Sequence, residues 1–239
     1  MFEELKNDEF LMKLSKACLS SGHTLYVVGG CVRDLFIKGN FSGDIDICSS
    51  ISLEELKIIL ETAGAAIKVK NKKLETAEIT NGSMVYEFAR LREEEYGKNI
   101  NHTPTSVNFI TDVYKDAKRR DFTINSLYYD TYNNKIIDPT GGTNDVKHKI
   151  IKAVISPNES FIKDPARILR LVDLYARLNF KIEKNTLMEA IQNAKMVYKL
   201  TSARRKIELD RIRANVKTEE QQNRIYCLLK KLGLDDILL

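Results

Sequence analysis

The segment "LYVVGGCVRDLFIKGNFSGDIDIC" (residues 25–48) constrains the fold more than any other part of the chain. An apolar run typical of a buried strand ends at a glycine pair, a helical run follows, and a second strand-like segment begins with "DID". Alternate residues of a strand project to the same face, so we expect Asp44 and Asp46 to point together while Ile45 enters the core. The segment therefore predicts an α+β fold with two carboxylates at a strand end.

The carboxylate pair predicts a site for a divalent cation. Two ionised carboxylates side by side repel each other, and Mg²⁺ removes that repulsion while it also binds substrate phosphates. Gly29 and Gly30 predict a phosphate cradle, because the free N–H groups of a helix N-terminus point at a ligand. Arg33 can add a fork of donors one turn later. Each feature alone also fits a solvated strand end or a tight turn, but their short separation favours a triphosphate site.

The spacing of apolar residues predicts where helices begin and end. One helix is expected over residues 3–21, and another over residues 53–62 with Ser52 and Glu55 as a capping box. From residue 157 onward strand signals stop and apolar residues recur at helical spacing. We therefore expect that part of the chain to be all-helical.

Strand-like segments fill the chain before that point. "MVYEFARLR" is expected to be one strand, paired through the Asn81-Gly82 turn with "ETAEIT". A second hairpin is expected around Asn133-Asn134, and the polar stretch "REEEYGKNINHTPTS" between them is expected to be a loop. The chain is thus divided into a head domain over residues 1–155 and a helical part over residues 156–239.

Composition limits the partners and the compartment. No apolar run approaches the ~18 residues that a membrane span needs, and the N-terminus lacks the pattern of a signal peptide. The 4 cysteines are scattered, which favours reduced thiols in a cytoplasmic protein without a zinc site. The net charge is +5, and from Pro157 onward there are 17 Lys and Arg against 11 Asp and Glu. Such a basic part fits RNA, or simply a set of solvated helix faces.

Five segments together resemble one known family. "GGCVRD" with "DIDI" is similar to the nucleotide-binding motif of class II tRNA nucleotidyltransferases (CCA-adding enzymes) and bacterial poly(A) polymerases. "KRRDFTINSLYYD", "IIDPTGGTNDVKHKIIKAV", "KDPARILR" and "LTSARRKIELDRI" resemble later motifs of that family, in the same order. The resemblance implies a polymerase-beta-like nucleotidyltransferase head, with a mixed sheet flanked by helices. An all-helical neck and the start of an RNA-binding body would follow it.

The resemblance also implies roles for individual residues. Glu87 matches a recurrent acidic position, as a third carboxylate near the metals or as a partner for Arg92. "REEEYGKNINHTPTSVNF" lies where the family has a flexible loop that helps the site switch from CTP to ATP. The nucleotide-binding positions are Gly29, Gly30, Arg33, Arg120, Asp121, Asn125, Asp164, Arg167 and Arg170, and the metal-binding positions are Asp44 and Asp46.

The segment "KDPAR" allows two interpretations that are compatible with each other. Asp164 followed by Pro165 is typical of a helix start, with the aspartate as N-cap. Asp164 and Arg167 also lie on one side of the first turn, where they offer an acceptor beside a donor. Cytosine and adenine present the complementary pattern, whereas uracil and guanine present the reverse. The family usually has Glu where this chain has Lys163.

The implied reaction is CCA addition to the 3′ end of tRNA from CTP and ATP, with two Mg²⁺ ions. A poly(A) polymerase or an enzyme that adds only A would carry the same motifs, and an RNA-binding protein with an inactive site is a further alternative. Members of the family usually continue into domains that grip the tRNA elbow, while this sequence stops just after the neck. We expect no membrane partner, and a homodimer is left open.

Overall fold

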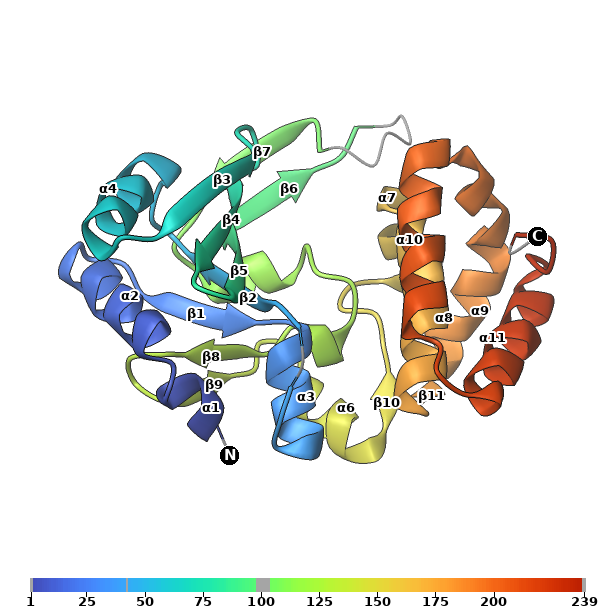
Figure 1. Cartoon of the computed structure of the whole chain (residues 1–239). Coiled ribbons are helices and arrows are strands. Elements are labelled where there is room, and N and C mark those ends of the chain that lie inside the picture. The colour runs from blue at the N-terminus through green and yellow to red at the C-terminus, as the bar shows by residue number, and fades with distance from the viewer. Residues whose placement is uncertain (1, 42, 98–103, 238–239) are drawn as a thin grey trace. The chain divides into compact units, whose positions relative to one another are not determined.

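The structure is a computed structural model that describes residues 2–41, 43–97 and 104–237 (Figure 1). The chain forms two compact units. The head unit comprises Met1–Glu94, Ser106–Arg120 and Ile124–Thr143, and the helical unit comprises Glu95–Thr105, Asp121–Thr123 and Asn144–Leu239. No helix within the described ranges is long and apolar enough to cross a membrane. The predicted division at residue 155 stays a prediction.

A seven-stranded mixed sheet forms the centre of the head unit, in the order β3-β4-β5-β2-β1-β8-β9 (Figure 1). Strands β2 and β5 run parallel, and the other neighbours in the sheet are antiparallel. This confirms the predicted α+β class. The strands are β1 (Leu25–Val28), β2 (Ile45–Ser49), β3 (Ala66–Asn71), β4 (Thr76–Asn81), β5 (Met84–Arg90), β8 (Tyr128–Asp130) and β9 (Lys135–Ile137).

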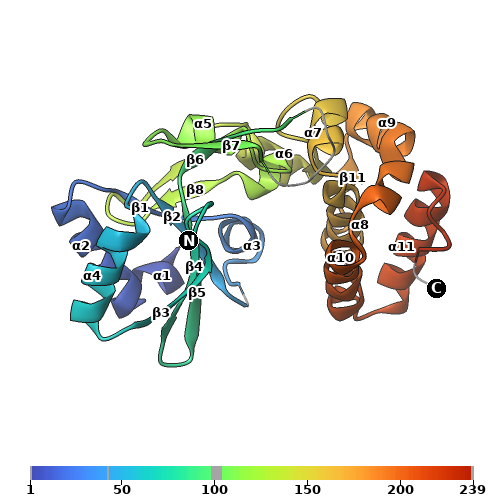
Figure 2. The ribbon, with the colours of Figure 1, turned by 90° about the horizontal axis from the view of Figure 1, so that it is seen from above.

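One face of this sheet packs against helices, because its alternate residues are apolar. Ile45 and Ile47 of β2 are 1% exposed, and Tyr86 of β5 packs against Phe10 with ring centroids 5.2 Å apart. Helices α2 (Glu9–Ser20) and α4 (Leu53–Ala63) lie beside each other over the sheet (Figure 2). The other face holds a smaller core around Cys48, Leu91 and Tyr128. The acidic residues of "DID" are thus left on a face that is only partly covered.

The helices of the head unit begin at polar caps. The predicted helix over residues 3–21 is two helices, α1 (Glu3–Lys6) and α2, because the Asp8 carboxylate accepts the Leu11 N–H and starts α2 anew. The capping box predicted before α4 is present, with both reciprocal bonds between Ser52 and Glu55. Helices α3 (Gly30–Lys38) and α5 (Val113–Ala117) complete the unit.

The expected strand over "MVYEFARLR" is interrupted. It breaks at Leu91, whose side chain enters the smaller core, and the chain continues as β6 (Arg92–Glu95). Strand β6 pairs with β7 (Ser106–Phe109) in a separate two-stranded sheet, so the expected polar loop begins and ends as strands. The middle of that loop, residues 98–103, lies outside the described residues.

The helical unit is built mainly from helices, as predicted, with one exception. Strand β10 (Ile150–Ile151) pairs in parallel with β11 (Lys181–Ile182). The sequence shows no strand pattern at β11, because this short strand forms through its contact with β10. Helix α8 lies at the centre and contacts both α10 and α11 (Figures 1 and 2). The helices are α6 (Gly142–His148), α7 (Pro157–Lys163), α8 (Ala166–Leu178), α9 (Lys184–Asn193), α10 (Ser202–Asn215) and α11 (Glu219–Leu232), with the 3₁₀ turn Ala194–Lys199.

Candidate active site

The glycine turn and the second aspartate of "DID" lie against each other in the head unit. Gly29 joins β1 to α3 with φ +84°, a conformation that favours glycine. A Cβ at Gly29 would lie 2.9 Å from Oδ2 of Asp46, closer than real contacts allow. No side chain caps α3 at Gly29. The turn therefore leaves the first N–H groups of a helix beside a carboxylate, as the spacing of the two motifs predicts.

The carboxylates gather on the less covered face of the sheet. Asp44 and Asp46 are exposed while Ile45 is buried, which confirms the predicted alternation. Glu87 of β5 lies directly beside Asp46 in the register of the two parallel strands. Burial raises the pKa of Glu87, and the charges of Glu78, Asp44 and Asp46 raise it further against the opposing effect of Lys70. Glu87 thus lies beside Asp46, while Arg92 pairs with Glu94 at 2.8 Å, and the role of Glu87 near a metal stays a prediction.

Arg33 is buried under the glycine turn. Its side chain is 2% exposed, and its guanidinium contacts Asp34 at 2.7 Å and donates to Oδ1 of Asn125. A Cβ at Gly30 would lie 3.4 Å from an Arg33 nitrogen, so the guanidinium lies directly beneath the turn. Arg33 thus ties α3 to the later "RRDFTIN" segment. Its direct contact with a phosphate stays a prediction.

The two arginines of "KRRDFTIN" are anchored by Asp116, which is 0% exposed. Its carboxylate accepts from Nε of Arg119 at 2.8 Å, from Nε of Arg120 at 3.2 Å and from the Tyr128 hydroxyl at 2.7 Å. Burial alone would raise the pKa of Asp116, but the charges of the two guanidinium groups outweigh it and lower the pKa well below its usual range. Phosphate binding by Arg120 stays a prediction.

Sequence reasoning missed Asp116, although the signal is present. An aspartate three and four residues before two arginines on a helical segment predicts i,i+3 and i,i+4 ion pairs. What the sequence does not show is that the helix α5 buries this aspartate against β2 and β8. Asp116 also accepts the backbone N–H of Arg92 at 3.1 Å, which fixes the start of β6.

The middle residues of the same motif, Asp121–Thr123, belong to the helical unit. Asp121 pairs with Arg170 of α8 at 2.8 Å, and its carboxylate accepts the N–H of Phe122 at 2.7 Å. Thr123 donates to the Asp145 carboxylate at 2.6 Å, in the segment "GGTNDV". Two predicted nucleotide-binding residues, Asp121 and Arg170, are thus brought together.

The predicted base-reading pair lies at the start of α8. The helix begins one residue later than expected, since Pro165 is its N-cap, but the Asp164 carboxylate still accepts the Ala166 N–H at 3.1 Å. Arg167 is buried, and its guanidinium donates to the Ser160 hydroxyl at 2.7 Å. Asp164 therefore accepts a backbone N–H at the helix start, as expected of a capping residue, but it lies one residue before the N-cap position. Base reading by Asp164 and Arg167 stays a prediction.

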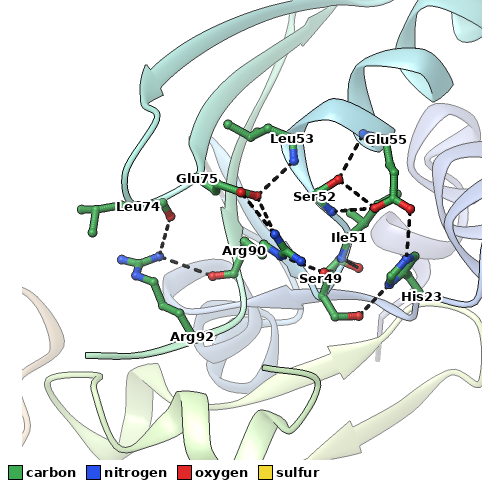
Figure 3. A network of polar contacts seen from close by, with 11 residues as sticks. His23, Ser49, Ile51, Ser52, Leu53, Glu55, Leu74, Glu75, Arg90 and Arg92 are labelled. Atoms are coloured by element: carbon green, nitrogen blue, oxygen red, sulfur yellow. Dashed lines mark hydrogen bonds and ion pairs between the residues drawn. The ribbon is translucent and has the colours of Figure 1, made fainter. Parts of the chain in front are cut away.

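A polar network holds the carboxyl ends of β2 and β5 (Figure 3). Nη1 of Arg90 donates to both carboxylate oxygens of Glu75 at 3.1 Å, and its Nε donates to the Ser50 carbonyl at 2.9 Å. Glu75 also accepts the Leu53 N–H at 3.1 Å. The network joins the end of β2 to the start of α4 and to the β3–β4 turn, so it fixes the two strands that carry Asp46 and Glu87.

The residues present fit Mg²⁺ bound jointly with a substrate. Among the described side chains, no three His, Cys, Asp or Glu gather as a complete metal-binding set. Mg²⁺ commonly needs only one or two carboxylates plus phosphate oxygens. Burial is the main cause that raises the pKa of Glu87, and Lys70 opposes it more than any one neighbouring carboxylate adds to it. Asp44 and Asp46 are the residues that would hold the ion.

Comparison with known proteins gives the same assignment. The Poly A polymerase head domain family matches residues 25–152, more than half of the chain. The chain belongs to this family. A CCA-adding enzyme of Bacillus velezensis is 30% identical over 202 residues, which cover 84% of this chain and 49% of the relative. The resemblance seen in the motifs is thereby confirmed.

Solved structures related to the family share the fold. The CCA-adding enzyme of Bacillus stearothermophilus in complex with CTP has a TM-score of 0.81 at 27% identity, covering 95% of this chain and 52% of that one. A tRNA nucleotidyltransferase complexed with a primer tRNA and an incoming ATP analog has a TM-score of 0.75 at 26% identity, covering 95% and 62%. This chain therefore spans about half the length of the curated relatives it matches.

The family match includes the carboxylates, the glycine turn and the "RRDFTIN" segment, which all lie within residues 25–152. Asp164, Arg167 and Arg170 lie beyond it, in α8 and just before it. The assignment of the head thus rests on the family itself, whereas the assignment of the base-reading residues rests on the motif alone.

Proposed function

We propose that this chain transfers nucleotides from CTP and ATP to the 3′ end of tRNA and builds CCA, with pyrophosphate as the second product. The observation that carries the proposal is the contact between Asp46 and Gly29, next to Glu87. It supports the proposal, because a carboxylate that could bind Mg²⁺ lies beside a turn whose N–H groups could bind a triphosphate. The names of the curated relatives and the CTP complex of a similar structure support the same substrates.

In the proposed reaction the RNA 3′-oxygen forms a bond to the α-phosphorus. The bond between the α-phosphorus and the oxygen that bridges to the β-phosphate breaks, and pyrophosphate leaves. Bound Mg²⁺ would lower the pKa of the 3′-hydroxyl and neutralise charge on the phosphates. Asp44 and Asp46 would hold the cation, and Glu87 would add negative charge beside them. The N–H groups after Gly29 and Gly30 bind phosphate oxygens. Arg33 positions this turn through its bonds to Asp34 and Asn125.

Base selection is proposed for the helical unit. The Asp164 carboxylate accepts from the exocyclic amine of cytosine or adenine, and Arg167 donates to the adjacent ring nitrogen. UTP and GTP are rejected because they present the reverse pattern, which leaves both protein groups unpaired. Asp121 and Arg170 act as a pair that positions the ribose and phosphates. The basic helices contact the RNA backbone, so binding is expected to weaken steeply with salt.

A second candidate, a poly(A) polymerase or an enzyme that adds only A, is favoured by the family name itself. The test is to incubate the protein and Mg²⁺ with tRNA that lacks CCA, giving each nucleoside triphosphate alone and then all together. Addition that stops at CCA supports the proposal. Long A tails, or addition of A only, would establish the second candidate, and no incorporation under any condition would refute both.

A further inference from the structure

The edge strand of the head sheet carries a run of positive charge that the proposed function does not use. The segment "IKVKNKK" (residues 67–73) contains 4 lysines and no acidic residue. Lys68 and Lys70 belong to β3, and Lys72 and Lys73 to the turn that follows. All four lysines are exposed.

The register of the strands places these lysines on the same face as the carboxylates. Lys68 lies opposite Glu78 of β4, Glu78 lies opposite Glu87 of β5, and Glu87 lies beside Asp46 of β2. Direct cross-strand partners share a face. Lys70 lies at an irregularity in the register between Val69 and Asn71, and its ammonium lies 2.6 Å from the Glu78 carboxylate, so it reaches the same face. A row of charged side chains therefore runs from the edge strand to the catalytic aspartates.

The sheet order separates two positively polarised regions. In the order β3-β4-β5-β2-β1, the glycine turn follows β1 on one flank of Asp46, and the lysines of β3 lie on the other flank. Three strand spacings, about 14 Å, separate β3 from β2, which is the length of a few nucleotides. A nucleotidyl transfer joins two polyanions, and the glycine turn already takes the triphosphate. The second flank is thus where the other polyanion fits by charge.

We propose that Lys68 and Lys70 bind the phosphodiester backbone of the RNA primer next to its reacting 3′ end. This inference rests on the proposed function and assigns a surface within it. Lys70 gives one of its three ammonium donors to Glu78, which orients the group and leaves donors for phosphate oxygens. The hydrogen bond to Glu78 is the largest cause that raises the pKa of Lys70. The charges of Glu87 and Asp44 raise this pKa further, because both carboxylates lie on the same face of the sheet.

An edge strand rich in lysine has a second explanation. Lysines on an edge discourage pairing with the edge of another sheet. That role predicts aggregation when the lysines are removed, without any effect on RNA. The phosphate-binding role predicts weaker RNA binding in a protein that stays monodisperse, so the two are separated by experiment.

The experiment compares the full chain with the double variant Lys68→Gln/Lys70→Gln. Binding of tRNA lacking CCA is measured by filter retention between 50 and 200 mM salt, with KM for RNA and for CTP measured separately. We expect affinity for RNA to fall roughly tenfold and the slope of log K against log salt to decrease by about 1.4. KM for RNA rises correspondingly, while kcat and KM for CTP stay unchanged. The matched control is Lys13→Gln/Lys16→Gln on α2, which covers the opposite face of the sheet.

A variant of opposite sign sharpens the test. Glu78→Gln releases Lys70 and removes a negative charge, so RNA should bind more tightly. Unchanged RNA affinity in the Lys68/Lys70 variant, or an equal loss in the Lys13/Lys16 control, overturns the proposal. A selective rise in KM for CTP would instead assign the lysines to the triphosphate and also overturn it. Filter retention needs no catalysis, so a wild-type protein that binds RNA through these lysines but incorporates nothing would refute only the proposed function.

Discussion

Oδ2 of Asp46 lies 2.9 Å from the position that a Cβ on Gly29 would occupy. The same glycine has φ +84°, where an L side chain is strained. The Asp46 side chain of β2 can therefore approach the turn after β1 only because Gly29 has no Cβ atom. Any side chain at Gly29 must displace the carboxylate proposed to hold the metal.

The first prediction concerns Gly29→Ala. We expect kcat/KM for nucleotide addition to fall at least about a hundredfold, since a displacement near 1 Å at a reacting group has that effect. The control is Gly39→Ala at the end of α3, where φ is +77° but nothing lies within 4 Å of the new Cβ. Gly39→Ala should lower the melting temperature while the folded protein keeps its activity. Equal activity of the two variants would show that the contact with Asp46 is irrelevant.

Replacement of the carboxylate itself provides the second prediction. Asp46→Asn should lower kcat by about a thousandfold or more, because a metal ion supplies several kcal/mol of charge stabilisation. Stability should not fall, since Asp46 is exposed and lies beside another carboxylate, Glu87. Single-turnover incorporation and thermal melting measure the two effects, with Glu61→Gln on α4 as a control. Retention of more than a tenth of the activity would contradict the role of Asp46.

These two predictions depend on a part of the site that the sequence did predict. The glycine pair, the "DID" alternation and the order strand–helix–strand are local patterns, so they predict a glycine turn and a carboxylate pair close together. The pairing of β1 with β2 brings Gly29 and Asp46 side by side, and their roles stay predictions. The burial of Arg33 could not be predicted, because its partner Asn125 is distant in sequence. The break of β5 at Leu91 was also missed, since a small core on the second face of the sheet, not the strand pattern, draws that side chain inward.

The third prediction is that Asp116→Asn destabilises the protein strongly. Arg119 and Arg120 would keep their buried charges without the carboxylate that compensates them, which costs about 3–5 kcal/mol. Urea unfolding at pH 7 measures the loss. Asp112→Asn at the start of the same helix is the control, because asparagine caps a helix as well as aspartate does. A loss below about 1 kcal/mol would mean that the cluster is not a stabilising centre.

The pH dependence of the same residue provides a fourth prediction. The charges of Arg119 and Arg120 overcome burial and lower the pKa of Asp116 in the folded state. Its contribution to stability is therefore complete above the unfolded pKa of about 3.9 and is lost as the pH falls toward the folded pKa. The free energy of unfolding of the wild type should decrease below about pH 4, and this decrease should be smaller in Asp116→Asn. Parallel curves for the two proteins would rule out this linkage.

The fifth prediction tests the network of Figure 3. A double-mutant cycle with Arg90→Met and Glu75→Gln should give a coupling of about 1–2 kcal/mol, because both side chains are largely buried. The exposed pair Lys206–Asp210 on α10 is the comparison, and its coupling should be too small to measure. Urea unfolding of the single and double variants determines both values. Equal couplings would indicate that burial adds nothing to the Arg90–Glu75 pair.

The "RRDFTIN" segment passes from the head unit to the helical unit after Arg120 and returns after Thr123. Further crossings follow Glu94, Thr105 and Thr143. Neither unit is therefore one continuous piece of the gene, and a single stop codon or start codon cannot isolate either of them. Recombination would have to exchange the head unit and the helical unit together. We expect insertions to be tolerated in surface turns within one unit and not at the points where the chain crosses between units.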